Sequence, residues 1–74
     1  GMFNLDVPAD EVEEAIEETE RAISRVMADS ESIDLLPQNS YIRRLQHEMA
    51  ERYSLASQSY GREPHRRVRI SRHH

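Results

Sequence analysis

The chain has 74 residues, which is enough for one small domain. It lacks cysteine, which excludes disulfide bridges and thiolate metal sites. Because a lack of cysteine is typical of a reducing compartment, we expect a cytoplasmic protein. It contains neither a signal-peptide pattern nor a run approaching the roughly 20 apolar residues of a membrane span, so we expect no membrane contact. The net charge of −4 hides a split, because residues 1–38 carry eleven acids against two arginines and residues 39–74 carry eight arginines against three glutamates, which favours a polyanionic partner for the basic half.

The first nine residues are expected to lie outside the domain. Gly1-Met2 has the look of an expression scar, and residues 1–9 are predicted to form a linker from an upstream domain. The alternation of Phe3, Leu5 and Val7 with polar residues would also suit a short strand that Pro8 ends.

Residues 10–28 are predicted to form an amphipathic helix. Asp10 is a suitable N-cap, and Glu13 occupies the capping-box position. The side chains expected to be buried recur at helical spacing: Val12, Ile16, Thr19, Ile23, Val26 and Met27. The glutamates of the first half form either an acidic interaction surface or the solvated face of a packing helix.

A short strand and a second helix follow. Residues 33–36 are apolar enough for a brief strand, which Pro37 stops. Asn39 or Ser40 is predicted to cap a helix that runs to about Tyr53. Its buried stripe is expected to be Ile42, Leu45, Met49 and Tyr53.

The last third of the chain is predicted to form a β-hairpin. Residues 55–60 and 66–71 both alternate, and the turn residues of 61–64 join them. Val68 and Ile70 are expected to point inward, and Arg67 and Arg69 outward. The fold predicted is α+β in the order α-β-α-β-β, with two helices on one face of a small, mostly antiparallel, three-stranded sheet.

The residues with the clearest chemical potential are Arg43 and His47, which are four apart on the second helix and so lie on one face. That face is expected at the edge of the buried stripe, next to Ser40 and Ala50. Spacing alone leaves the pair incidental. The surrounding pattern does not, because Leu36-Pro37, Ser40, Arg43-x-x-x-His47 and Ala50 are followed by a serine-rich and arginine-rich hairpin: Leu55, Ser57, Ser59, Gly61, Glu63-Pro64, Arg66-Arg67-Val68 and Ile70.

This constellation closely resembles the R-3-H domain, a family named for its Arg-three-residues-His signature whose members bind single-stranded nucleic acid. The run from Leu35 to Tyr53 is most similar to bacterial and plastid members, in which the domain ends a larger protein. Those hosts are AAA-type ATPases similar to a stage III sporulation protein, which we favour, or Jag-type RNA-binding proteins that also carry a KH domain. The resemblance implies a binding domain over residues 10–72 and a tail at 73–74.

The resemblance and the residue chemistry together predict a non-catalytic module for single-stranded RNA or DNA. Arg43 can bind a phosphate with two parallel hydrogen bonds, and His47 can donate to a phosphate or stack on a base. The supporting residues are predicted to be Ser40, at an anion-favouring helix start, and Arg44, Arg66 and Arg67. We expect no catalytic residues, metal or cofactor; Glu51, for example, stands where a zinc-protease motif would need a second histidine.

The sequence leaves three alternatives open, and the least supported of them is a metal-free nuclease that uses His47, Arg43 and a glutamate. The outer sheet face, with Gln58, Tyr60, Arg67 and Arg69, could offer a stacking platform for bases instead of the Arg43/His47 face. The acidic first helix could make the chain a protein-interaction module, docking a basic partner or other domains of a parent protein.

Overall fold

The structure is a computed structural model that describes residues 9–73. Its helices and strands confirm the α+β class and the predicted order: α1 (Ala9–Asp29), β1 (Ile33–Asp34), α2 (Ser40–Arg52), β2 (Leu55–Tyr60) and β3 (Arg67–Arg72). The possible strand at residues 3–7, most of the predicted linker and the final residue of the predicted tail lie outside the described residues. Ala9, which we placed in the linker, is already helical.

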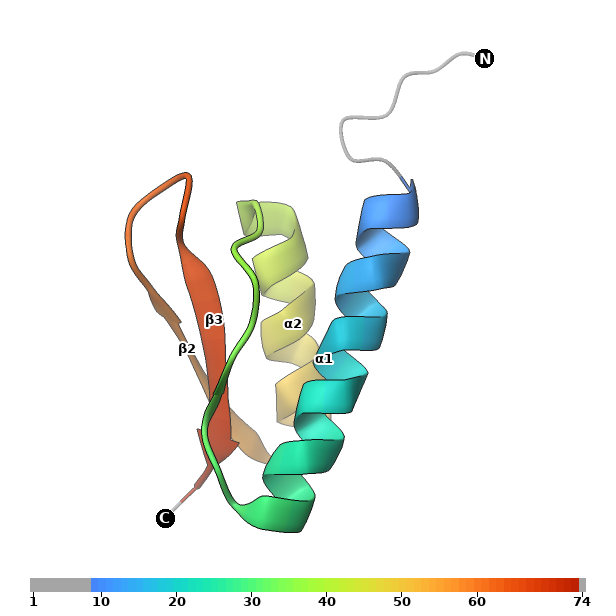
Figure 1. Cartoon of the computed structure of the whole chain (residues 1–74), viewed down its shortest axis with the longest axis vertical. Helices are drawn as coiled ribbons and strands as arrows, with labels where there is room; N and C mark the ends of the chain where they lie inside the picture. The colour runs from blue at the N-terminus through green and yellow to red at the C-terminus, as the bar shows by residue number, and fades with distance from the viewer. Residues whose placement is uncertain (1–8, 74) are drawn as a thin grey trace.

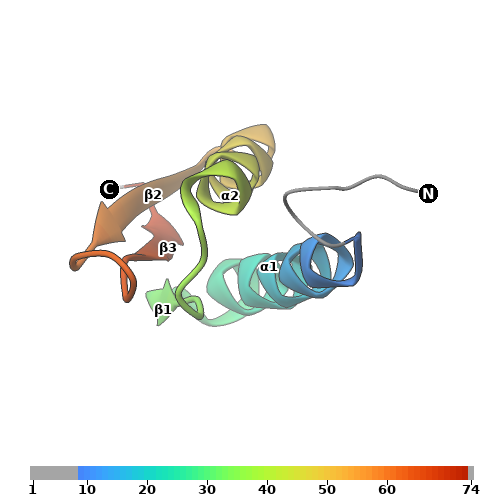
Figure 2. The ribbon, with the colours of Figure 1, turned by 90° about the horizontal axis from the view of Figure 1, so that it is seen from above.

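Both helices cover one face of the three-stranded sheet, as predicted (Figures 1 and 2). The strand order is β1-β3-β2, and both pairings are antiparallel. The central strand β3 sends Val68 and Ile70 to the helices, where both are fully buried, and Arg67 and Arg69 to the opposite face. The hairpin prediction is therefore confirmed, with β3 shifted by one residue from the predicted 66–71.

Helix α1 packs through small and β-branched residues. Its buried side chains are Ala15, Thr19, Ala22, Ile23 and Val26. The prediction that Met27 is buried is wrong, since Met27 is 46% exposed near the end of the helix. The prediction that Asp10 is the N-cap is also wrong, since Asp10 lies inside the first turn of α1. Within residues 9–73 no helix is long and apolar enough to cross a membrane.

The C-terminal end of α1 is closed by a residue from the other end of the chain. Helix α1 carries no basic residue in its last turn. Arg72 of β3 supplies one, because its guanidinium donates to the carbonyl of Val26 at 3.3 Å and also to that of Met27. A cation at this end of a helix interacts favourably with the helix dipole and binds carbonyls that the helix itself leaves free.

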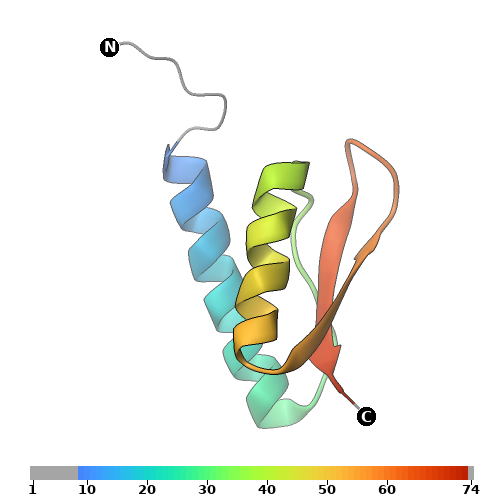
Figure 3. The ribbon, with the colours of Figure 1, turned by 180° about the vertical axis from the view of Figure 1, so that it is seen from behind.

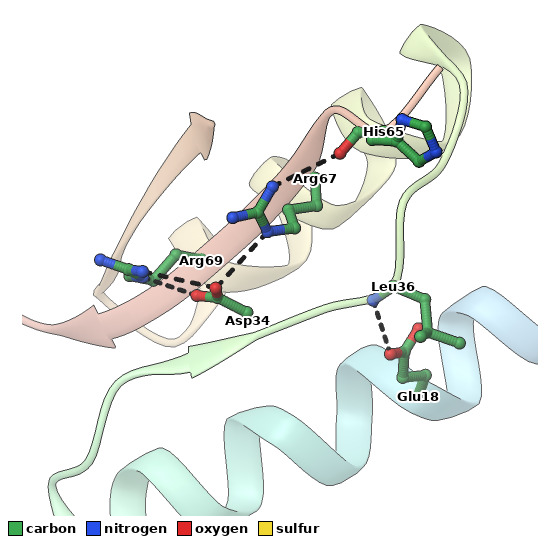
Figure 4. Close-up of polar contacts among 6 residues, drawn as sticks. All are labelled: Glu18, Asp34, Leu36, His65, Arg67 and Arg69. Carbon is green, nitrogen blue, oxygen red and sulfur yellow. Dashed lines mark hydrogen bonds and ion pairs between the residues drawn. The ribbon is translucent and has the colours of Figure 1, made fainter. Parts of the chain in front are cut away.

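Strand β1 is shorter than the predicted 33–36 because the backbone changes partner. The amide of Leu35 still donates to the Val68 carbonyl of β3 at 2.8 Å. The next amide, that of Leu36, turns to α1 and donates to the Glu18 carboxylate at 2.9 Å (Figure 4). Pro37 then has no amide hydrogen to offer. Leu35 is buried, whereas Leu36 is 65% exposed.

Helix α2 begins with Asn39 as its N-cap, whose side chain accepts from the Ile42 amide at 2.9 Å, so Asn39 and not Ser40 is the cap. The predicted buried stripe is partly wrong, since Tyr53 is 51% exposed and Leu45 and Met49 are only half-buried. The buried set is Ile42, Arg43, Gln46 and Ala50. The buried side of α2 is rotated relative to the predicted stripe because α2 contacts both α1 and β2. Arg43 is part of this buried side because the fold supplies its guanidinium with partners.

A single apolar core joins all these elements. It consists of residues from both helices, all three strands and the segment after β1: Ala22, Ile23, Val26, Leu35, Ala50, Leu55, Val68 and Ile70, with Ile33 and Met49 packed against them. This core holds α2 against the hairpin, and that contact sets the geometry of the candidate site.

Candidate nucleic-acid interface

The N-terminal end of α2 lies beside the hairpin loop, residues 61–66, at one end of the molecule (Figure 3). The segment before α2 is tied to this loop, since the Gln38 amide donates to the Arg66 carbonyl at 3.3 Å. The loop turns at Gly61, whose φ of +88° is a conformation that other residues rarely adopt. A side chain there would also meet the Arg67 guanidinium at 2.9 Å. The loop is therefore held in one position relative to α2.

Arg43 crosses from α2 to the hairpin loop and is only 9% exposed. One nitrogen of its guanidinium donates to the Gln38 carbonyl at 2.6 Å. The other forms an ion pair with the Glu63 carboxylate at 2.8 Å. Glu63 is 61% exposed, so the carboxylate reaches the buried guanidinium from the solvent side. A carboxylate and a phosphate bind arginine with similar geometry, so the outer side of the Arg43 guanidinium is suited to an anionic partner.

His47 lies one turn further along α2 and is held by two serines of β2. Its Nδ1 lies 2.6 Å from the Ser57 hydroxyl, and its Nε2 lies 2.9 Å from the Ser59 hydroxyl. Partial burial lowers the pKa of His47 below its ordinary 6.5, and the positive charge of Arg43 lowers that pKa further. His47 is therefore neutral at pH 7, so that one serine donates to the ring and the other accepts from it.

The remaining residues predicted for this end of the molecule lie on its surface. Ser40 and Arg44 are exposed on the first turns of α2, and Arg66 is half-buried in the hairpin loop, where its guanidinium donates to the Gly61 carbonyl at 2.7 Å. Together with Arg43 they form what we call the α2–hairpin surface: Ser40, Arg43, Arg44 and Arg66.

Arg67 lies apart from these four residues, although its guanidinium reaches the hairpin loop and donates to the His65 carbonyl at 3.5 Å. It points to the sheet face away from the helices, where Asp34 of β1 lies between Arg67 and Arg69 (Figure 4). Asp34 accepts from Arg69 at 2.6 and 3.3 Å and pairs with Arg67 at 3.5 Å. The hydrogen bond from Arg69 is the main cause that holds the pKa of Asp34 below its ordinary value. The structure thus divides the predicted site residues between two faces.

Comparison with known proteins gives one family. The family model of the R-3-H domain matches residues 13–72, which include Arg43, His47 and the whole hairpin. The chain belongs to this family. R-3-H domains are nucleic-acid-binding modules that bind single strands.

One curated protein is similar to the chain. The chain is 38% identical over 58 residues to the "Uncharacterized protein ycf45" of Porphyra purpurea. The match covers 77% of this chain but spans only about a tenth of that protein's length. No solved structure matches the chain.

The site prediction did not include the residues that position Arg43 and His47. Glu63, Ser57 and Ser59 were noted only as parts of the family pattern, with no contact assigned to them. A signal for the serines was present, because strand alternation puts both on the same face as Leu55, where buried hydroxyls require partners. His47 is the polar residue that faces them. No comparable local signal links Glu63 to a helix twenty residues earlier.

The geometry of this R-3-H domain suits binding of anions. It supplies one buried and two more accessible guanidinium groups beside a helix start, whose amides and dipole also favour negative charge. His47 has both ring nitrogens engaged by serines, and across residues 9–73 no group of three acidic or histidine side chains could hold a metal ion.

Proposed function

We propose that this R-3-H domain binds the sugar-phosphate backbone of single-stranded nucleic acid at the α2–hairpin surface. Arg43 binds one phosphate, which replaces the Glu63 carboxylate on the outer side of the guanidinium. Arg44 and Arg66 bind neighbouring phosphates, and the Ser40 hydroxyl adds a donor at the helix start. The module is non-catalytic.

The observation that carries this proposal is the asymmetric environment of Arg43. Its inner nitrogen is fixed by the Gln38 carbonyl, so the guanidinium plane is oriented before any ligand arrives. Its outer nitrogen is paired with a largely exposed carboxylate, which solvent reaches and can replace. An oriented guanidinium with a solvent-exposed anionic partner is suited to exchanging that partner for a phosphate.

His47 acts in this proposal as a positioning residue. Its bonds to Ser57 and Ser59 fix α2 against β2, which keeps Arg43 opposite the hairpin loop. Because the ring is neutral at pH 7, it adds no positive charge to the surface. Direct donation from His47 to a phosphate requires the release of one serine.

A titration of labelled oligonucleotides tests the proposal. Binding should be weak and salt-dependent, and log K should fall against log[salt] with a slope of about −2 to −3 if three or four phosphates of a single strand are neutralised. Arg44→Ala and Arg66→Ala should each weaken binding and reduce that slope by about 0.7. The matched control is Arg25→Ala, an exposed arginine on α1. Equal affinity of the control and the two site variants contradicts the proposal.

A second function, docking of a basic protein partner, is favoured by one surface feature. A shallow hollow of about 520 Å³ on α1 is lined by Glu11, Glu14, Glu17 and Glu18, with the exposed Leu36 beside it. This function predicts no binding of oligonucleotides above background, and a partner that salt releases. The same titration therefore separates the two functions.

We also propose that residues 10–72 form one module of a longer protein. The curated relative is about ten times longer than its match to this chain. Weak binding by the isolated module would then be strengthened by neighbouring domains, since linked sites bind with an increased effective concentration.

A further inference from the structure

The sheet face away from the helices carries a connected set of side chains from all three strands. Strand register places Arg69 of β3 between Asp34 of β1 and Gln58 of β2. The Arg69 guanidinium bonds Asp34 on one side and lies 4.6 Å from the centroid of the Tyr60 ring on the other. The Tyr60 hydroxyl donates to the Gln58 amide oxygen at 2.6 Å. We call this set the Tyr60–Arg69 face.

The two planar groups of this face are held in place without a ligand. The ring is fixed by its hydroxyl, and the guanidinium is fixed by two bonds to a carboxylate. A group that is already ordered loses less conformational entropy when it binds a partner. Aromatic rings and guanidinium planes are also the groups on which unpaired bases stack.

The charge of this face also favours a nucleic acid. Arg67 and Arg69 face one carboxylate, that of Asp34, which is ionised at neutral pH and whose pKa the hydrogen bond from Arg69 lowers further. One positive charge therefore remains. The opposite charge prevails on α1, where glutamates line the hollow.

A hollow of about 620 Å³ runs along β2, the edge strand of the sheet. Gln58, Tyr60 and Arg69 line it from the outer face, and His47 and Ser57 line it from the helix side. Its volume lies within the range of about 300–1,000 Å³ that is usual for small-ligand sites. The hollow reaches His47, which lies one turn after Arg43 on α2, so a strand bound at the α2–hairpin surface would pass close to the Tyr60–Arg69 face.

We propose that the Tyr60–Arg69 face is a subsite for a single nucleobase of the bound strand. Because Arg69 already lies over one face of the Tyr60 ring, the base stacks on the outer side of this pair, and the Gln58 amide contacts the edge of the base. This inference rests on the proposed function and adds base contacts to a site that otherwise reads only phosphates. One ring provides for one base, so sequence preference is weak.

The test compares oligonucleotides that carry bases with an abasic strand. Fluorescence anisotropy is measured for labelled oligo-dT, oligo-U and an abasic deoxyribose-phosphate oligomer of equal length at one low salt concentration. Stacking of one base should make the base-carrying strands bind about 5- to 100-fold more tightly than the abasic one.

Variants of tyrosine locate the effect. Tyr60→Leu should remove the advantage of the base-carrying strands and leave the abasic affinity unchanged, whereas Tyr60→Phe should keep most of that advantage. The matched control is Tyr53→Leu, since Tyr53 is 51% exposed beyond the end of α2. In addition, the ring-proton NMR signals of Tyr60 in the wild type should move upfield with oligo-dT and stay in place with the abasic strand, which requires no variant.

The outcomes separate the two proposals. Equal binding of base-carrying and abasic strands to the wild type, or an equal loss of both in Tyr60→Leu, overturns the base subsite and leaves the phosphate surface intact. Absence of salt-dependent binding for every strand overturns both.

Discussion

The ion pair between Arg43 and Glu63 gives a prediction that runs against the usual effect of removing a surface contact. Glu63→Gln should tighten binding of a single-stranded oligonucleotide, because a phosphate no longer has to displace a carboxylate from the guanidinium. The carboxylate oxygen lies 2.8 Å from the Arg43 nitrogen, but Glu63 is 61% exposed. Solvent screens the carboxylate but not the nearly buried guanidinium, so the range of about 0.2–1 kcal/mol for fully exposed pairs is a lower limit for this one.

Removal of the negative charge also ends its repulsion of the incoming phosphate, which is of similar size at this exposure. The combined gain is about 1 kcal/mol, or about fivefold in Kd at low salt. It should shrink as salt rises, since the screening length falls from about 10 Å at 0.1 M to about 3 Å at 1 M. The free energy of unfolding should fall by about 1 kcal/mol, because the buried guanidinium loses its counter-charge but keeps its bond to the Gln38 carbonyl.

The assay is fluorescence anisotropy with a labelled oligonucleotide at low and high salt. The matched control is Glu31→Gln, which changes the net charge equally but lies just after the C-terminal end of α1, at the end of the molecule opposite the hairpin loop (Figure 1). Tightening by Glu63→Gln alone supports competition at Arg43. Equal tightening by both variants would reduce the effect to net charge, and unchanged or weaker binding by Glu63→Gln would refute the reasoning.

Three further predictions concern stability and charge. The pKa of His47 in the folded state is below its ordinary 6.5, so the unfolded chain binds more protons than the folded one as the pH falls. The contribution of His47 to the free energy of unfolding should therefore be full above about pH 6.5 and decrease on acidification. Below about pH 6.5 the thermal midpoint should fall more in the wild type than in His47→Gln. Arg72→Gln should lower the free energy of unfolding by about 1–2 kcal/mol in urea titrations, because α1 loses hydrogen bonds and a cation at its C-terminal end; an unchanged midpoint would contradict the capping role. Asp34→Asn should raise the oligonucleotide affinity a few-fold at low salt, because Arg67 and Arg69 lose their counter-charge. The same anisotropy titration checks this prediction, and an equal or weaker affinity would argue against binding of nucleic acid at the Tyr60–Arg69 face.

Local patterns were sufficient to predict the order and nearly all the bounds of the helices and strands. Alternation in residues 55–60 and 66–71 places Val68 and Ile70 inward, and both are fully buried. Such periodicity is a property of each segment alone and needs no knowledge of the rest of the chain. The exact end of β1 was not predictable in this way, because the carboxylate of Glu18 on α1 takes the amide that would have continued the strand.

The buried side of α2 could not be predicted, for a related reason. Apolar spacing identifies Ile42 but cannot foresee that Arg43 is buried, because the carbonyl of Gln38 and the carboxylate of Glu63 are brought to it only by the folded hairpin. A buried charge is tolerated where partners are supplied, and those partners are distant in the sequence. The Arg-x-x-x-His spacing thus identified the candidate site, while the electrostatics of that site depend on tertiary contacts.

The central claim, that the α2–hairpin surface binds single-stranded nucleic acid, is tested most directly by mapping backbone amide NMR shifts during titration with a short oligonucleotide. The account predicts that shifts concentrate at the start of α2, around Ser40 to Arg44, and in the hairpin loop, and that raised salt reverses them. Shifts confined to the acidic face of α1, or no shifts at low salt and high oligonucleotide concentration, would contradict it.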